Sequence, residues 1–273
     1  MVGLKRKILI TNDDGIYSSG IIASYQALKD MGEIYIVAPA VQRSGVGRSI
    51  SLMEPVRVSE VVLNTEDRIR GYAVDGTPAD SVLIAVHEII GEVPDLVVSG
   101  INLGENVSTE AVLTSGTVGA AFEAATHGSM TVAISLEVSM KDKFADMFDF
   151  MNRAGEMDYS LCIDVLRNLA KILLERGFPV GVDVLNVNIP SKWNGKVAFT
   201  RLAKRLYLTR IDTRKDPRGR IYYWLDGDEV EDDEEGTDLH ALRRGYISIT
   251  PLSLDNTSKE SLESVKRWFY EIC

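Results

Sequence analysis

The chain has few of the residues that build disulfide frameworks or thiolate centres. Its 273 residues include two cysteines and three histidines, and the cysteines, Cys162 and Cys273, lie far apart. This spacing argues against a disulfide scaffold and against a paired-cysteine zinc site. The scarcity of both residue types also disfavours Cys/His nucleophilic catalysis. We therefore expect a protein of the reducing cytoplasm.

Long apolar runs and an excess of positive charge are also missing. The first apolar run, residues 8–10, gives way to Asn12-Asp13-Asp14, which is far short of a signal core or a membrane span. Lys+Arg number 30 against 40 Asp+Glu, for a formal net charge of -10. Attraction to a phosphate backbone therefore cannot hold the whole chain on a nucleic acid polymer. We expect no membrane and no nucleic acid polymer as partners, whereas a nucleotide-sized ligand remains compatible with the charge.

Several common motifs are absent or incomplete. There is no Gly-Lys-Ser/Thr phosphate loop and no Gly-x-Ser-x-Gly elbow, which disfavours the NTPase and α/β-hydrolase classes. Gly45-Val46-Gly47 lacks the third glycine of a dinucleotide fingerprint. His87-Glu88 begins like a zinc-protease motif, but Gly91 stands where the second histidine would be.

The apolar pattern of the first half is typical of an α/β fold. Short runs without alternation predict strands buried on both faces of a parallel sheet, at residues 7–11, 34–38, 95–99 and 130–135. Helices are predicted between them: one over about 21–31 with Gly32 as its C-cap, one over 77–90 and one from about 117 to 127. Thr77 is the expected N-cap of the second, with Pro78 at the first helical position. This alternation predicts a Rossmann-like, doubly wound, mostly parallel sheet over about residues 1–140.

The second half has a different character. Segments 197–200, 206–208 and 221–224 are predicted to be antiparallel strands or hairpin arms separated by charged turns. The run 226–235 holds eight acidic residues, and we interpret it as a solvated hairpin tip or loop. A final helix is expected to carry Leu262, Val265 and Phe269 on one stripe. We expect a catalytic core over residues 1–190 and, over 191–273, an extension whose hairpin arm and last helix serve oligomerisation.

Polar residues follow the predicted strands where ligands bind in open parallel sheets. Asp13 and Asp14 follow the first strand, Ser44 the second and Asn102 the third. Such an all-oxygen set suits Mg²⁺ or Mn²⁺ better than zinc, and a bound cation would relieve the repulsion between the two carboxylates. The structural alternative is that these residues are ordinary turn and capping residues.

The segment Ser115-Gly116-Thr117 opens the alanine-rich helix. Its amides and hydroxyls face outward at the positive end of the helix dipole, which makes it a candidate phosphate site. An ordinary serine or threonine N-cap is the alternative.

Seven motifs in one order and spacing resemble the SurE family of stationary-phase survival proteins over nearly the whole chain. They are residues 8–15 (ILITNDDG), Ala38-Pro39 with 43–45 (RSG), 76–80 (GTPAD), 98–102 (VSGIN) with Gly104 and Asn106, 115–118 (SGTV), 186–190 (NVNIP) and 246–252 (YISITPL).

The resemblance implies a metal-dependent phosphatase that hydrolyses nucleoside 5′-monophosphates, and often 3′-monophosphates. It implies a Rossmann-like core and a swapped C-terminal arm that builds a homodimer or homotetramer. The family's metal ligands correspond to Asp13, Asp14, Ser44 and Asn102. Two departures, Ala40 where many members have an acidic residue and Thr114 where many have an aromatic one, bear on base preference and not on the metal ligands.

The resulting hypothesis is metal-assisted phosphomonoester hydrolysis, with Asp13 and Asp14 as the catalytic carboxylates. Asn106 and the helix start, Ser115, Gly116 and Thr117, would hold the phosphate. Attack by water is preferred to attack by Asp13, because a carboxylate committed to a cation is a poorer nucleophile. Two other hypotheses remain open: a non-enzymatic nucleotide-binding module and a metal-dependent nucleoside hydrolase.

Overall fold

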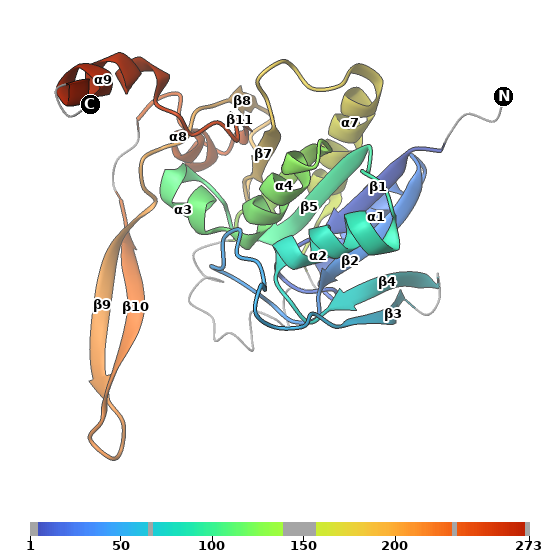
Figure 1. Ribbon diagram of the computed structural model, residues 1–273, viewed down its shortest axis with the longest axis horizontal. Coiled ribbons are helices and arrows are strands. Elements are labelled where there is room, and N and C mark those ends of the chain that lie inside the picture. The colour runs from blue at the N-terminus through green and yellow to red at the C-terminus, as the bar shows by residue number, and fades with distance from the viewer. Residues whose placement is uncertain (1–4, 65–67, 139–156, 231–233, 271–273) are drawn as a thin grey trace.

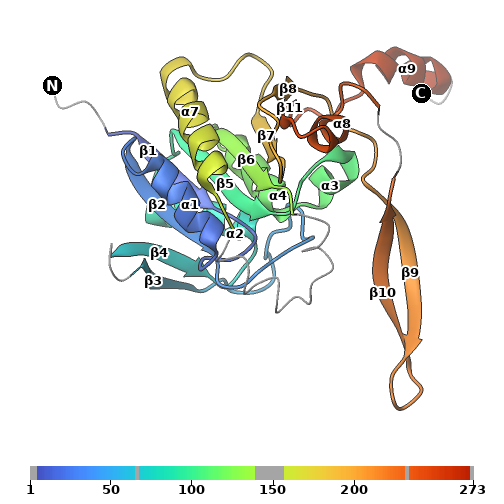
Figure 2. The ribbon, with the colours of Figure 1, turned by 180° about the vertical axis from the view of Figure 1, so that it is seen from behind.

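The computed structural model describes residues 5–64, 68–138, 157–230 and 234–270. A nine-stranded sheet runs through the body in the order β3-β4-β2-β1-β5-β6-β7-β11-β8, with helices on both of its faces (Figure 1). A separate two-stranded hairpin, β9 and β10, projects away from this body, as the view from behind also shows (Figure 2). No helix in the described part of the chain combines the length and the apolar character that a membrane span requires.

The strands of the main sheet are β1 Lys7–Thr11, β2 Glu33–Pro39, β3 Val58–Asn64, β4 Ile69–Val74, β5 Leu96–Leu103, β6 Met130–Leu136, β7 Val184–Ile189, β8 Val197–Phe199 and β11 Ile247–Leu252. The hairpin consists of β9 Tyr207–Lys215 and β10 Ile221–Glu229. The helices are α1 Ser19–Leu28, α2 Pro78–Ile84 with a π-helical turn Ala85–Ile89, α3 Ser108–Thr114, α4 Gly116–Thr126, α7 Ser160–Arg176, α8 Asp238–Arg243 and α9 Leu262–Phe269, preceded by a 3₁₀ turn Lys259–Ser261.

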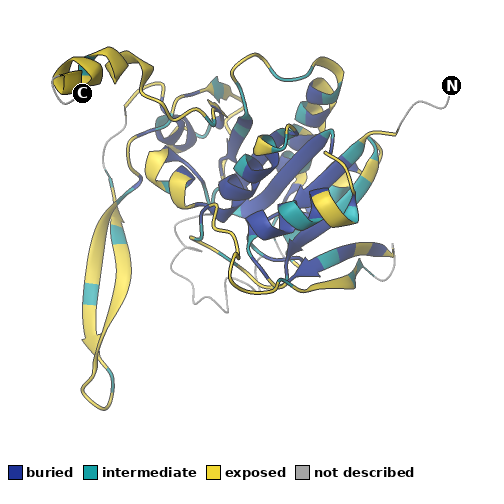
Figure 3. Ribbon diagram, in the orientation of Figure 1, coloured by how far each residue is buried: buried dark blue, intermediate teal, exposed yellow. Residues whose placement is uncertain are grey.

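The central strand β1 shows why the sheet is buried on both faces. Successive side chains of a strand point to opposite sides. Ile8 and Ile10 join the core beneath α1 and α7, while Leu9 joins the core beneath α2 and α4. All three are fully buried, and the ribbon coloured by burial shows the central strands of the sheet mostly as buried (Figure 3). The unbroken apolar run that predicted this strand is therefore the consequence of two helical layers, and the four strands predicted for the first half are confirmed.

The end predicted for the first helix is wrong. The structure ends α1 at Leu28 with Lys29 as its C-cap, and Gly32 is not part of the cap. A Cβ atom at Gly32 would lie 2.4 Å from the backbone oxygen of Arg6. The glycine is there because two backbone segments approach each other closely, which is a tertiary requirement.

The predicted start of α2 is confirmed, and its capping box also fixes a neighbouring loop. The Asp80 carboxylate accepts from the backbone N–H of Thr77 at 2.8 Å and from the backbone N–H and the hydroxyl of Ser51 at 2.9 and 2.7 Å. Burial alone would raise the pKa of Asp80, but these hydrogen bonds outweigh it and lower the pKa. Asp80 therefore joins the loop that follows β2 to the start of α2.

Two expectations for the second half are wrong, the second of them in part. Segment 197–200 is no hairpin arm: β8 pairs with β11 in parallel and so extends the main sheet. The acidic run, expected to be a hairpin tip or a loop, is not the tip, because Asp226, Asp228 and Glu229 lie in β10 and the turn lies at residues 216–220. Glu234 and Glu235 do lie in an exposed loop, and residues 231–233 lie outside the described residues. The hairpin of β9 and β10 and the final helix are confirmed. The main sheet continues past residue 190 through β8 and β11.

We predict that Asp80→Ala lowers the free energy of unfolding by about 1–2 kcal/mol, because it removes an N-cap partner and leaves partly buried N–H groups unpaired. Urea denaturation measures the change. Asp30→Ala is the matched control, since Asp30 is exposed, and its effect should stay within about 0.5 kcal/mol. Equal effects of the two substitutions would contradict the role given to Asp80.

Candidate active site

A tight turn directs two carboxylates from the end of β1 toward the carboxyl edge of the sheet. The side chain of Asn12 accepts from the backbone N–H of Gly15 and donates to the backbone oxygen of Gly15, both at 3.2 Å, and it donates to the Ser18 hydroxyl at 2.7 Å. Gly15 has a φ of 98°, in the left-handed region that favours glycine. The turn holds Asp13 and Asp14 side by side at the end of the central strand.

Asp13 lies against the beginning of α4. The Thr117 hydroxyl donates to Oδ1 of Asp13 at 2.5 Å, and Ser115 caps the helix by accepting from the N–H of Val118 at 3.1 Å. Burial raises the pKa of Asp13, opposed by the Thr117 hydroxyl and by backbone N–H groups that include those of Thr117 and Gly116. A Cβ atom at Gly116 would lie 2.7 Å from the Asp13 Cβ, so the helix can approach this closely only with a glycine there.

Asp14 lies between the ends of β2 and β5. Its Oδ2 accepts from the backbone N–H of Leu103 at 3.1 Å, and the Gln42 amide reaches Asp14 Oδ1 at 3.5 Å and the Ser44 hydroxyl at 3.0 Å. Burial, and then the charge of Asp13, raise the pKa of Asp14 to about 7. The sequence analysis missed Gln42, and its position in the same exit loop as Ser44 was the only signal for it.

Asn102 is the residue before Leu103, so it also lies close to Asp14. Its Nδ2 donates to the backbone oxygen of Gly104 at 2.6 Å. This bond uses the amide nitrogen and leaves Oδ1, the atom that can bind a cation.

Asn106 lies on the far side of β5, at the ends of β6 and β7. Its Nδ2 donates to Ser135 Oγ and its backbone N–H to Asn188 Oδ1, both at 2.8 Å, while the amide of Asn186 donates to its backbone oxygen at 2.8 Å. These three partners were not recognised as site residues from the sequence. The polar Asn186 and Asn188 in an otherwise buried strand were the available signal.

The donor atoms at this edge fit a hard divalent cation. Neither Asp13 nor Asp14 forms an ion pair within the described ranges. Burial disfavours the charged forms of both, and the charge of Asp13 further disfavours that of Asp14, so a bound cation would compensate for both effects. No group of three or more His, Cys, Asp or Glu side chains suited to a metal occurs among the described residues. A cation would therefore need neutral oxygens beside the two carboxylates, and Ser44 and Asn102 offer them.

The fold defines an α/β protein of the Rossmann-like type, a class in which ligands bind at the carboxyl ends of the parallel strands. Comparison with known proteins makes the class specific. The family model described as "Survival protein SurE" matches residues 8–209, and the chain belongs to that family.

Relatives match almost end to end. A protein of Archaeoglobus fulgidus named "5'-nucleotidase SurE" is 59% identical over 263 residues, which cover 96% of this chain and 97% of the relative. A protein of the same name from Methanothrix thermoacetophila is 48% identical, with 93% and 95% covered. The crystal structure of the SurE protein from Aquifex aeolicus superposes with a TM-score of 0.76 at 35% identity, and the match covers 96% of this chain and 99% of that one.

We predict that the metal-free protein loses stability as the pH rises from about 4 to above 7. A carboxylate whose pKa is raised in the folded state contributes stability below its unfolded value, near 3.9, and loses it as the pH passes through the folded value, which is about 7 for Asp14. Asp13→Asn removes one of the two charges, so in EDTA at pH 8 the variant should melt at a higher temperature than the wild type.

Thermal melts in EDTA at pH 5 and pH 8 test this. Added Mn²⁺ should raise the melting temperature of the wild type at pH 8 and have little effect on Asp13→Asn. A melting temperature that falls equally between the two pH values in both proteins would contradict the prediction.

Proposed function

We propose that this protein is a divalent-metal-dependent 5′-nucleotidase, which hydrolyses nucleoside 5′-monophosphates to nucleoside and phosphate with Mg²⁺ or Mn²⁺. One observation carries the proposal: the buried Asp13 and the half-buried Asp14, without cationic partners in the described ranges, lie side by side at the carboxyl end of the central strand. Relatives named "5'-nucleotidase SurE" match nearly the full chain and support it.

In this proposal Asp13, Asp14, Ser44 and Asn102 hold the cation through oxygen atoms. The cation, when bound, supplies positive charge that favours attack on phosphorus. The phosphate would lie at the N-terminal end of α4, at Ser115, Gly116 and Thr117. The positive end of the helix dipole favours an anion there. Asn106 completes the phosphate site from the opposite side of β5.

The contacts of Asp13 favour attack by water. Its Oδ1 accepts a 2.5 Å hydrogen bond from Thr117, and backbone N–H groups at the α4 start also stabilise its charge. A carboxylate that accepts these hydrogen bonds, and also serves a cation, is a weaker nucleophile toward phosphorus. Asp13 and Asp14 therefore act by holding and orienting, and the nucleophile is water.

The proposal also assigns a role to each of the two parts of the chain. Residues 1–190 form the catalytic core, and residues 191–273, which also add β8 and β11 to the main sheet, form the extension that assembles a homodimer or homotetramer. We propose a cytoplasmic location, which the two distant cysteines support.

The proposal predicts that Asp13→Asn lowers phosphate release from adenosine 5′-monophosphate by at least about 100-fold with saturating Mn²⁺, because it removes one charged ligand of the cation. Colorimetric phosphate release measures this, with the exposed Asp30→Asn as the control. Wild-type turnover in Asp13→Asn would overturn the metal assignment. Release of free base without phosphate would identify a nucleoside hydrolase, and binding without release of either product a non-enzymatic module.

The hairpin arm, residues 207–229, supports the proposed assembly. It carries exposed apolar side chains on a two-stranded sheet, and such a sheet is marginally stable alone. They are Leu208, Ile211, Ile221, Tyr222, Tyr223, Trp224 and Leu225, with exposed fractions from 40% to 81%. Aromatic side chains of this kind contribute most when a subunit contact removes them from water.

We predict that replacing residues 208–228 with an Asn-Gly turn lowers the mass in solution. Tyr207 and Glu229 are directly paired, so a two-residue turn can join them without disturbing the body. Light scattering compares the shortened and full chains. An unchanged mass would show that the arm does not assemble the subunits.

A further inference from the structure

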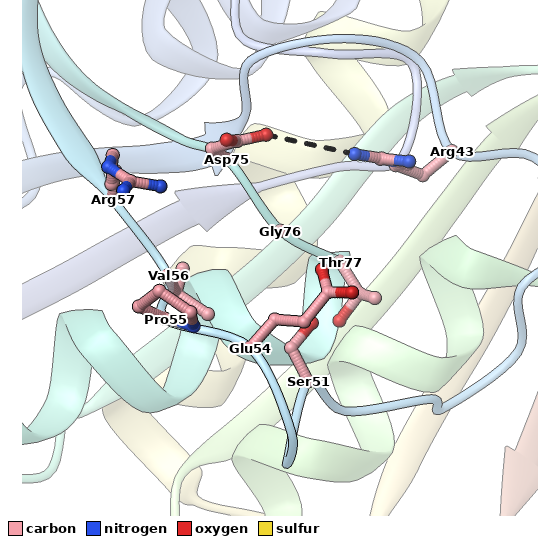
Figure 4. A pocket seen from close by; sticks show the side chains of 9 residues that line it. All are labelled: Arg43, Ser51, Glu54, Pro55, Val56, Arg57, Asp75, Gly76 and Thr77. Carbon is pink, nitrogen blue, oxygen red and sulfur yellow. Dashed lines mark ion pairs between the residues drawn. The ribbon is translucent and has the colours of Figure 1, made fainter.

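A cavity of about 300 Å³ opens at the carboxyl end of β4, between the loop after β2 and the start of α2 (Figure 4). This volume is at the lower end of the range for small-molecule sites. Four charged side chains line it: Arg43, Glu54, Arg57 and Asp75. We call it the β4 pocket.

The charged groups of the β4 pocket are almost unused within the described part of the chain. The one ion pair among them joins Arg43 to Asp75 at 4.0 Å, and the Arg43 Nε atom is buried without a hydrogen-bond partner. The pocket's hydroxyls, in contrast, are engaged: Ser51 donates to Asp80 and Thr77 to the backbone oxygen of Ser49, both at 2.7 Å. The pocket thus offers guanidinium donors and carboxylate acceptors to a ligand.

One residue of the β4 pocket also contacts the end of β1, where Asp13 and Asp14 lie. The backbone N–H of Arg43 donates to the backbone oxygen of Asp13 at 2.7 Å, so one residue borders both places. Asp75 follows β4, which lies two strands from β1 in the sheet order. Two strand spacings are roughly 10 Å, the scale of a nucleoside attached to a phosphate at the Asp13 end.

Resting on the proposed function, we infer that the β4 pocket binds the nucleoside of the substrate and that Asp75 accepts hydrogen bonds from the ribose 2′- and 3′-hydroxyls. A carboxylate is an acceptor only, so Asp75 suits hydroxyl donors and repels a phosphate. An acidic side chain bonds a ribose hydroxyl in the same way in dinucleotide-binding sheets. Arg43 orients the Asp75 carboxylate, and the planar guanidinium of Arg57 offers a surface on which a base can stack.

Calorimetric titration with adenosine and with 2′,3′-dideoxyadenosine, in the presence of Mg²⁺, tests the inference without catalysis. The wild type should bind adenosine about tenfold more tightly than the dideoxy compound, as expected for hydrogen bonds to a charged but exposed acceptor. Asp75→Asn should bind the two about equally, and Asp75→Glu should recover part of the preference. The control is Asp30→Asn, because Asp30 is exposed and does not line the β4 pocket. This variant should keep the wild-type preference.

A kinetic measurement gives a second readout. The ratio of the KM for adenosine 5′-monophosphate to the KM for glycerol phosphate, which has no nucleoside, should rise about tenfold in Asp75→Asn and stay at the wild-type value in Asp30→Asn. Because Asp75 is exposed, its substitution should leave the melting temperature close to that of the wild type. Thermal melts check that the variant is folded.

The outcomes separate this inference from the proposed activity. A wild-type protein that does not bind adenosine, or that binds both nucleosides equally, overturns the pocket assignment even if nucleotides are hydrolysed. If Asp75→Asn binds nucleoside bisphosphates more tightly than the wild type does, and neither protein binds adenosine, the pocket is a second phosphate site. This outcome would also overturn the assignment of the pocket to the nucleoside. If the wild type prefers adenosine to the dideoxy compound but releases phosphate from no nucleotide, the pocket assignment is supported and the proposed activity is refuted.

Discussion

The repulsion between Asp13 and Asp14 is the constraint around which the carboxyl edge of the sheet is organised. Two neighbouring carboxylates held at a sheet edge with little water around them oppose folding, and three elements compensate for this. The Asn12 turn fixes their positions, α4 directs Thr117 and its first amides at Asp13, and the N–H of Leu103 at the end of β5 bonds Asp14. The close approach of α4 in turn requires a glycine at position 116. The Asn12 turn, the placement of α4 and the order of the strands thus all offset the repulsion between the two carboxylates.

The same constraint links binding to stability. Under the proposed function, the two groups that must be charged to bind a cation are groups whose charged form burial disfavours in the protein alone, so the fold retains a site that it would be more stable without. The Asp80 carboxylate shows the opposite case. It is also buried, yet donors from two segments satisfy it and its pKa is lowered. The two carboxylates differ in which effect is larger: at Asp80 the hydrogen bonds outweigh burial, whereas at Asp13 burial outweighs the hydrogen bonds from Thr117 and the start of α4.

The parts of the fold that depend on local patterns were predictable. The apolar runs of β1, β2, β5 and β6 and the Thr77 capping box identified their elements, because burial on two faces and helix capping leave marks within a few residues. The Gly32 and β8 expectations failed because a close backbone approach to Arg6 and a pairing with β11 involve partners distant in sequence. Likewise, strand order could suggest that Asp13, Asp14, Ser44 and Asn102 share one edge, but it could not show that Thr117 bonds Asp13 or that Gln42 bridges Asp14 and Ser44.

The place of β11 in the sheet affects how the protein is made. This strand comes from residues 247–252, yet it lies between β7 and β8, which precede it in the chain. Asp238 makes a similar long-range link, because its carboxylate accepts from the N–H groups of Ser108 and Ala203. Pairings of such high contact order form slowly. On the ribosome, β7 therefore presents an unpaired edge from the time residues 184–189 emerge until residues 247–252 follow them, and during this interval chaperones have reason to shield that edge.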